Sequence, residues 1–213
     1  MVNGFKIKTC VFAFLVLYIS IDTFAQNPDI RILRSLNSPE RLPSDRFFQF
    51  ISNSDAYLVA GVPVVIGSVG FAKHDSQMFR NACVTLTAVA LNSCVTLALK
   101  YSVNRDRPFK TYPDIIKKSA AGSPSFPSGH TSSAFTLATS LSLNYPKWYI
   151  IAPSYLWAGT VGFSRMDLGV HYPSDVLAGA LIGSGCAWLS HYVNKRLIIK
   201  SNFAASRGKQ ESF

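Results

Sequence analysis

Four long apolar stretches dominate the chain, and none of them contains an Asp, Glu, Lys or Arg residue. They cover residues 56–72, 81–99, 148–163 and 176–193. Each has 16 to 19 residues, which at the α-helical rise of about 1.5 Å per residue corresponds to roughly 24 to 28 Å. The hydrocarbon core of a bilayer is about 30 Å thick. With a few flanking residues, each stretch therefore predicts a membrane-spanning helix.

A fifth stretch, residues 131–144, mixes apolar residues with several Ser and Thr residues. Small polar side chains of this kind suit a central helix that neighbouring helices shield from lipid. In the last apolar stretch, Gly179, Ala180, Gly183 and Gly185 would allow another helix to approach closely. The pattern predicts an all-α, membrane-embedded helical bundle with about five core spans. A soluble helical bundle with buried apolar helices is the alternative.

The chain before these stretches has two different parts. Residues 1–25 combine Lys6 and Lys8 with an apolar run and small residues before Gln26, which is the layout of a secretory signal peptide. A retained signal anchor is the alternative, and either would export Gln26. Residues 27–54 predict two short amphipathic helices that lie on the bilayer surface or against the bundle. From residue 26 to residue 213 we expect one domain.

Composition supports a membrane protein and argues against a nucleic-acid partner. The 213 residues are 48% hydrophobic and 15% charged, a balance that leans toward the membrane class. The net charge of +10 is high, but the cations are scattered over loops and form no basic run interleaved with aromatic residues. A membrane surface or an anionic substrate fits this charge better. The four cysteines indicate neither a disulfide framework nor a metal site.

Cationic residues beside the apolar stretches are the first sign of chemistry. Lys100 and Arg107 flank the end of the second stretch, and Arg165 follows the 148–163 stretch. Transfer of a phosphoryl group spreads negative charge over its equatorial oxygens, and fixed cations can meet that charge. The planar fork of arginine matches two phosphate oxygens, so lysine would not replace Arg107 or Arg165 without loss.

A second cluster lies directly before the fifth stretch. Ser128 is a candidate cap for a helix that begins there, and Gly129 allows the backbone to approach a phosphate closely. The start of a helix also presents unpaired N–H groups to an anion. His130 would thereby lie beside the bound phosphate.

The third cluster combines a histidine with a carboxylate. Asp175 follows His171 by four residues, with Pro173 at what reads as the first turn of the last helix. Residues four apart at a helix start can face each other. His74 and His191 belong to no motif. No His-x-x-x-His pair and no carboxylate cluster occurs, so we predict no metal site.

Taken together, the clusters resemble the signature of the type 2 phosphatidic acid phosphatase superfamily, which includes lipid phosphatases, bacterial acid phosphatases and vanadium haloperoxidases. That signature consists of Lys, six residues and Arg-Pro, then Pro-Ser-Gly-His, and finally Ser-Arg, five residues, His, three residues and Asp. The matching positions here are Lys100, Arg107, Pro108, Pro127, Ser128, Gly129, His130, Ser164, Arg165, His171 and Asp175.

The resemblance implies a role for each residue. His171 would be the nucleophile that forms a phosphohistidine, and His130 would protonate the oxygen of the leaving group. Asp175 would hold the imidazole of His171 and stabilise its positive form. The other signature residues would bind the phosphate: Lys100, Arg107, Ser128, Gly129 and Arg165. No cofactor is implied.

These inferences favour a metal-independent phosphatase of a lipid phosphate or isoprenyl diphosphate. If Gln26 is exported, alternation of five spans brings the three clusters to the exported face, which would be the periplasmic face of a bacterial inner membrane. Alternatives are an acid phosphatase for soluble phosphomonoesters, a vanadate-dependent haloperoxidase, or a non-catalytic membrane or lipid-binding protein. Selectivity for one lipid would reside in the helix crevice and in the loop of residues 110–125. Within that loop, Lys118 lies outside the motif, and we expect its removal to cost little.

Overall fold

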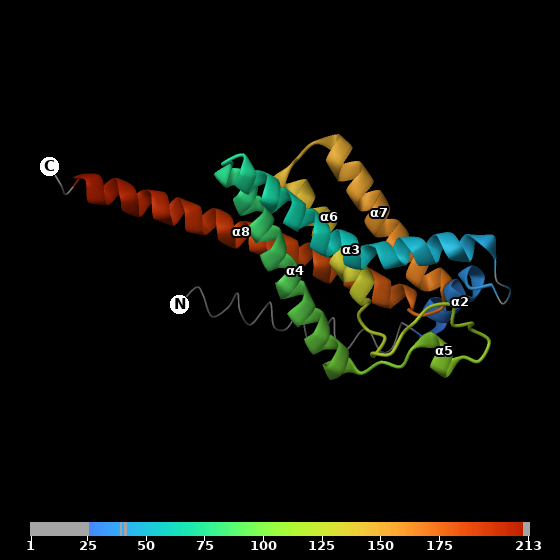
Figure 1. Ribbon diagram of the computed structural model, residues 1–213. Coiled ribbons are helices and arrows are strands. Elements are labelled where there is room, and N and C mark those ends of the chain that lie inside the picture. The colour runs from blue at the N-terminus through green and yellow to red at the C-terminus, as the bar shows by residue number, and fades with distance from the viewer. Residues whose placement is uncertain (1–25, 39, 41, 211–213) are drawn as a thin grey trace, which may run out of the picture.

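The structure, a computed structural model, describes residues 26–38, 40 and 42–210. The regular secondary structure of this part of the chain is helical. No strand occurs in these residues (Figure 1). The expected signal peptide of residues 1–25 lies outside them. The helices in chain order are α2 (Gln26–Leu36), α3 (Pro43–Ala72), α4 (Ser76–Val103), α5 (Pro108–Thr111), α6 (Gly129–Asn144), α7 (Trp148–Asp167) and α8 (Pro173–Gln210). The predicted all-α fold class is confirmed.

Each of the four apolar stretches lies within one long helix, in the order α3, α4, α7 and α8. By length and composition, α3, α4 and α8 are apolar enough to cross a membrane. Helices α6 and α7 have 16 and 20 residues. Their crossing of the membrane, and with it the number of about five spans, stays a prediction.

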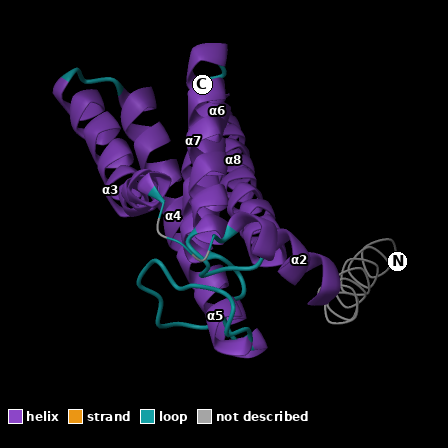
Figure 2. Cartoon of the chain, turned by 90° about the vertical axis from the view of Figure 1, so that its right-hand side faces the viewer, coloured by secondary structure: helices purple, strands orange, loops and turns teal. Residues whose placement is uncertain are grey.

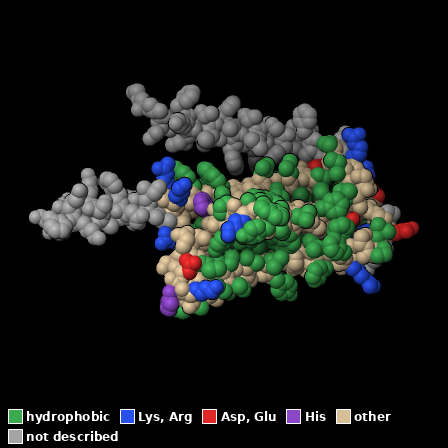
Figure 3. All heavy atoms as spheres, turned by 90° about the horizontal axis from the view of Figure 1, so that it is seen from above, with side chains coloured by type: hydrophobic (Ala, Val, Ile, Leu, Met, Phe, Trp, Pro, Cys, Tyr) green, Lys and Arg blue, Asp and Glu red, His purple; other side chains and the backbone are tan. Residues whose placement is uncertain are grey.

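The outer surface of the bundle carries many large apolar side chains. On the face drawn in Figure 3, such side chains cover the middle of the molecule, and charged side chains lie mainly toward its two ends. Val65, Leu97, Leu156 and Leu181 are all more than half exposed, and they come from four different helices. Apolar surface on this scale is unusual for a protein surrounded by water. It fits contact with lipid tails.

The region before the first apolar stretch differs from the expectation of two short helices. The first helix is present as α2, and its Ile30 and Leu33 are buried. The prediction of a separate second helix is wrong, because α3 begins at Pro43 and continues without a break to Ala72. Proline suits the first turn of a helix, and the Asp45 carboxylate accepts a hydrogen bond from the Leu42 N–H at 3.1 Å. No breaker separates this start from the apolar residues that follow.

Helix α6 lies inside the bundle, where it packs most extensively against α8 and also contacts α3, α4 and α7. Glycine makes the contact with α8 possible. A Cβ atom on Gly179 would lie 2.7 Å from the carbonyl oxygen of Ser128, and one on Gly183 would lie 2.1 Å from that of Ser132. Gly185 has open space instead. The expectation of close packing through small residues therefore holds for Gly179 and Gly183 and not for Gly185.

The polar connections of the chain gather at one end of the bundle. This end contains α2, the long α4–α6 connection with α5, and the turn between α7 and α8 (Figures 1 and 2). The α3–α4 and α6–α7 turns lie toward the other end. The three sequence clusters come from the first group of segments, and so the fold brings them together.

Candidate active site

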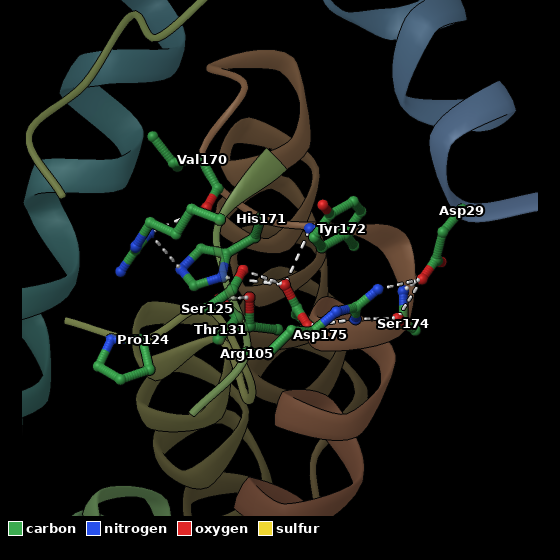
Figure 4. A network of polar contacts seen from close by, with 12 residues as sticks. Asp29, Arg105, Pro124, Ser125, Thr131, Val170, His171, Tyr172, Ser174 and Asp175 are labelled. Atoms are coloured by element: carbon green, nitrogen blue, oxygen red, sulfur yellow. Dashed lines mark hydrogen bonds and ion pairs between the residues drawn. The ribbon is translucent and has the colours of Figure 1, made fainter. Parts of the chain in front are cut away.

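His171 and Asp175 face each other at the start of α8. His171 lies in the turn before the helix, and Asp175 lies in its first turn. The distance from His171 Nδ1 to Asp175 Oδ2 is 3.5 Å, slightly longer than an ordinary hydrogen bond. Both side chains are buried (Figure 4).

The carboxylate of Asp175 is held on both of its oxygens. Oδ2 accepts hydrogen bonds from the hydroxyl of Ser125 at 2.5 Å and from the backbone N–H of Tyr172 at 2.9 Å. Oδ1 accepts a charged hydrogen bond from Arg105 Nη1 at 2.7 Å. The α4–α6 connection and the turn before α8 thus fix the orientation of Asp175 toward His171.

The second ring nitrogen of His171 faces a cation. Nε2 lies 3.3 Å from Nη1 of Arg107. Burial lowers the pKa of His171 to about 3, the nearby charge of Asp175 opposes this shift, and the charges of Arg107 and Arg165 add to it. The imidazole is therefore neutral near pH 7. Because Nδ1 faces the carboxylate, Nδ1 carries the proton and Nε2 keeps its lone pair.

Three buried cations surround this pair, and neutral groups hold all of them. Lys100 Nζ donates to the carbonyl oxygen of Pro124 at 2.7 Å. Arg107 donates from Nε to the Ser123 carbonyl at 2.7 Å and from Nη1 to the Val170 carbonyl at 2.9 Å.

Arg165 is also a buried cation that neutral groups hold. Its Nη1 donates to the hydroxyl of Ser52 at 2.5 Å and lies 3.5 Å from that of Ser119, while its Nε has no hydrogen-bond partner among the described residues. Within the described part of the chain, neither Arg165 nor Lys100 nor Arg107 lies within ion-pair distance of a carboxylate. Buried charges are normally paired. These three cations therefore form a place where an anion can bind.

The Pro-Ser-Gly-His cluster opens α6 beside these cations. His130 is half-buried in the first turn of the helix. Burial lowers the pKa of His130 to about 4, and the nearby charges of Arg165, Arg107 and Lys100 add to this shift. A Cβ atom on Gly129 would lie 3.8 Å from Cε of Lys100, so the glycine leaves space open toward that cation.

Ser128 occupies the position before α6 but does not cap the helix with its side chain. Its hydroxyl shares a 2.8 Å hydrogen bond with that of Thr131. Its backbone N–H donates to the carbonyl oxygen of Asp175 at 3.0 Å. The expectation of a side-chain cap is wrong, and the residue instead joins the start of α6 to the start of α8.

Four residues that the sequence reasoning missed contribute to this region. Arg105 and Ser125 bind Asp175, and Ser52 on α3 binds Arg165. Asp55, one turn further along α3, is buried and accepts a hydrogen bond from the Ser133 hydroxyl at 2.7 Å. The position of Asp55 directly before an apolar stretch was the one sequence feature that could have pointed to any of these four residues.

The structure argues against the expectation that the removal of Lys118 costs little. Its side chain is 2% exposed and forms a 3.0 Å ion pair with Asp45. Its Nζ also donates to the carbonyl oxygen of Glu40 at 3.2 Å. Lys118 therefore fastens the loop to the start of α3, whereas its neighbour Lys117 is exposed.

In the described residues, no three His, Cys, Asp or Glu side chains lie close enough together to share a metal ion. The absence of a metal from the reaction stays a prediction.

Comparisons with known proteins give a family and several relatives named as lipid phosphatases. A family model described as the PAP2 superfamily matches residues 81–199. The chain is 34% identical over 94 residues to a lipid A 4'-phosphatase of Bacteroides thetaiotaomicron, which covers 44% of this chain and 42% of the relative. It is 39% identical over 92 residues to an undecaprenyl-diphosphatase of Sulfolobus acidocaldarius, with 43% of this chain and 44% of the relative covered. The matched part thus spans less than half the length of both relatives.

A solved structure extends the similarity over more of the fold. The crystal structure of LpxE from Aquifex aeolicus matches with a TM-score of 0.65 and 31% sequence identity, covering 78% of this chain and 95% of that chain. The family model spans more than half of the chain and contains all three clusters around His171. The chain therefore belongs to the PAP2 superfamily.

Proposed function

We propose that the protein is a metal-independent phosphatase that hydrolyses a lipid phosphate or an isoprenyl diphosphate through a phosphohistidine intermediate. The observation that carries this proposal is a set of three buried cations around the neutral imidazole of His171. Among the described residues, these cations, Lys100, Arg107 and Arg165, have no carboxylate partner. A phosphate group supplies the negative charge that this arrangement lacks.

In the first half of the reaction, Nε2 of His171 attacks the phosphorus atom. A P–N bond forms, and the bond between phosphorus and the leaving-group oxygen breaks. Burial and the three cations lower the pKa of His130, and the bound phosphate offsets the cations, so that His130 carries a proton in the complex. It donates this proton to the leaving-group oxygen, and the leaving group departs as an alcohol or as a protonated phosphate. The Arg107 guanidinium beside Nε2 places the phosphate next to the attacking nitrogen.

In the second half, water attacks the phosphorus atom of the phosphohistidine. His130, now neutral, accepts a proton from this water, the P–N bond breaks, and inorganic phosphate leaves. His171 returns to its neutral form with the proton on Nδ1. One water is consumed, and both histidines regain their starting states.

The surrounding residues lower the barrier through fixed charges. The three cations meet the charge that develops on the equatorial oxygens, and the N–H groups at the start of α6 face the same anion. The imidazole ring carries a positive charge once it is phosphorylated, and the buried carboxylate of Asp175 stabilises that charge.

A membrane lipid is favoured over a soluble phosphomonoester as the substrate. A site at the edge of the bilayer is supported by the large apolar side chains that cover the middle of the bundle. The relatives named as a lipid A 4'-phosphatase and an undecaprenyl-diphosphatase both act on phosphates of lipids. We place the site on the periplasmic face of a bacterial inner membrane, because alternation from an exported Gln26 brings this end outside.

Phosphate release from purified protein in detergent tests the activity. Lipid A, undecaprenyl diphosphate and phosphatidic acid are compared with p-nitrophenyl phosphate, each with EDTA. We expect faster turnover of a lipid substrate that EDTA does not reduce. Activity that vanishes with EDTA and returns with magnesium contradicts the metal-independent mechanism, and a preference for p-nitrophenyl phosphate favours the soluble alternative.

Trapping tests the intermediate. Enzyme mixed with ³²P-labelled substrate and quenched in alkali should retain label on a base-stable, acid-labile phosphohistidine. His171→Ala should show none, and His191→Ala, at a histidine outside the motif, should label like the wild type. Label that survives in His171→Ala assigns the nucleophile to another residue.

Labelling of single cysteines with an impermeant reagent tests the orientation. In a cysteine-free background, Lys117→Cys lies in the loop at the site and Lys195→Cys lies just after the apolar stretch of α8, and both positions are exposed. Intact spheroplasts should label the first and not the second. The reverse result places the site in the cytoplasm.

A further inference from the structure

We infer that Asp29 and Arg105 are positioning residues for the Asp175–His171 pair, so that helix α2 completes the active site. This inference rests on the proposed function of His171. Asp29 lies outside residues 81–199, to which the family model extends. Arg105 lies between Lys100 and Arg107, at a position where the motif specifies no residue type.

Arg105 joins the carboxylates of Asp175 and Asp29. Its Nη1 donates to Asp175 Oδ1 at 2.7 Å and to the hydroxyl of Ser174 at 2.7 Å, and its Nη2 donates to Asp29 Oδ2 at 3.0 Å. The guanidinium also lies over the ring of Tyr172, with 3.9 Å between its carbon and the ring centre. Two carboxylates and one ring therefore fix this side chain in a single orientation (Figure 4).

Asp29 fastens α2 to the first residues of α8. Its Oδ1 accepts a hydrogen bond from the Ser174 backbone N–H at 2.9 Å. Its Oδ2 accepts from the hydroxyl of Ser174 and from Arg105. Asp29 is 5% exposed, so this contact lies within the protein. It connects α2 to the turn that holds His171.

The charge of Arg105 matters for Asp175 because the carboxylate is fully buried. A buried carboxylate without a cation tends to take up a proton and become neutral. Arg105 compensates one oxygen of Asp175, while the other oxygen remains directed at His171. Without Arg105, Asp175 would turn or lose its charge, and the imidazole would lose the group that holds its Nδ1 proton.

Arg105 differs from the three phosphate-binding cations in being fully paired. Asp29 and Asp175 take up its charge, whereas Lys100, Arg107 and Arg165 bind only neutral groups. Its contribution to the reaction therefore passes through Asp175 rather than through the phosphate. This division predicts an effect on turnover with little effect on substrate binding.

Kinetics of the full-length protein in detergent test the inference. Asp29→Asn removes the charge and one of the two accepting oxygens, and we expect kcat to fall about 10-fold with KM little changed. Arg105→Ala should lower kcat by about 100-fold, the upper range for groups that orient a catalytic side chain. Arg105→Lys should recover part of this loss. The matched control is Arg34→Gln, which breaks the exposed ion pair between Arg34 of the same helix α2 and Asp114 of the loop after α5 and should leave kcat unchanged.

A double-mutant cycle shows whether the effect passes through Asp175. In an Asp175→Asn background, Arg105→Lys should change kcat less than twofold, because the carboxylate that it acts on is absent. Multiplicative losses in the double variant would overturn the inference. So would a loss confined to KM, which would place Arg105 in contact with the substrate.

A spectroscopic measurement decides the inference without any substrate. The ring ¹⁵N shifts of His171, assigned by their absence in His171→Gln, report which nitrogen carries the proton. Wild type and Arg34→Gln should show the Nδ1-protonated form alone, and Arg105→Ala and Asp29→Asn a mixture of both forms. Unchanged shifts in a folded Arg105→Ala protein would overturn the inference. Failure of the wild-type protein to hydrolyse any lipid phosphate tested would count only against the proposed function, and the shifts would still decide the inference.

Discussion

Arg107 and Asp175 lie on opposite sides of the His171 ring, with Nη1 of the arginine 3.3 Å from Nε2 and a carboxylate oxygen 3.5 Å from Nδ1. Arg107 can only donate and the Asp175 carboxylate can only accept, so a neutral imidazole between them suits both only with its proton on Nδ1. The nitrogen next to the cation is left with the lone pair. The proposed nucleophile, His171, and the proposed phosphate-binding group of Arg107 are therefore neighbours.

The two histidines should respond differently to the leaving group. His171→Ala should abolish turnover for every substrate, because it removes the nitrogen that attacks phosphorus in the proposed mechanism. His130→Ala should lower kcat most for alkyl phosphates and least for p-nitrophenyl phosphate, since only a basic leaving group needs a proton. Measured kcat values for the two variants on both substrates make the comparison. An equal loss in His130→Ala on both substrates would exclude its role as the acid.

The two arginines separate geometry from charge. Arg107→Lys and Arg165→Lys keep the charge but lose the planar fork, and each should cost about 2 to 4 kcal/mol of transition-state stabilisation, by analogy with the removal of a preorganised donor. Lys117→Ala, in the exposed part of the neighbouring loop, is the control and should change kcat/KM little. Small and equal losses at all three positions would mean that the region attracts anions only through its overall charge.

Lys118→Ala should destabilise the fold rather than affect chemistry directly. The substitution leaves the buried carboxylate of Asp45 without its partner, and breaking a buried ion pair in this way costs about 3 to 5 kcal/mol. Thermal unfolding in detergent measures the loss, with Lys117→Ala as the exposed neighbour for comparison. A wild-type melting temperature in Lys118→Ala would show that the pair contributes nothing to stability.

Gly183 and Gly185 offer a test of the helix contact within one turn of α8. Gly183→Ala would put a Cβ atom 2.1 Å from the Ser132 carbonyl oxygen, so we expect a loss of about 1 to 3 kcal/mol as α6 and α8 move apart. Gly185→Ala meets open space and should be neutral or slightly stabilising. Melting temperatures of the two variants provide the measurement, and equal values would contradict the close approach.

The pKa of His171 has a consequence for stability against acid. Burial lowers it to about 3 in the folded protein, from about 6.5 in an unfolded chain. Between these two values the unfolded chain binds more protons, so the contribution of His171 to stability is present above pH 6.5 and is lost as the pH falls toward 3. Melting temperatures at pH 7 and pH 4 should therefore differ less in His171→Gln than in wild type. An equal or larger difference in the variant would show that His171 is not buried in its neutral form.

The apolar stretches predicted most of the fold because helices in lipid must satisfy their own backbone groups, which makes length and hydropathy sufficient signals. Spacing also predicted the contact of His171 with Asp175, since both residues belong to one turn. The continuous helix α3 was missed because polar residues before the apolar stretch resembled a separate amphipathic helix. Hydropathy alone does not separate those two cases.

Contacts between distant segments could not be read from the sequence. Asp29 and Ser174 are 145 positions apart, and Lys118 and Asp45 are 73 apart. A lone aspartate or lysine in a loop carries no local sign of its partner. The motif likewise specifies Lys100 and Arg107 without indicating that Arg105, which lies between them, pairs with the carboxylates of Asp29 and Asp175.

The hydrogen bond from the Ser128 N–H to the Asp175 carbonyl, together with the glycine contact of α6 and α8, ties the acid and the nucleophile to one rigid block. His130 and His171 then keep a constant separation whatever the substrate. The exposed part of the α4–α6 connection, residues 110–117, precedes the residues that hold Lys100, Arg107 and Asp175. That segment can diverge without changing the separation of the two histidines. A lineage of such proteins could exchange one lipid for another by changing that segment while its chemistry stayed the same.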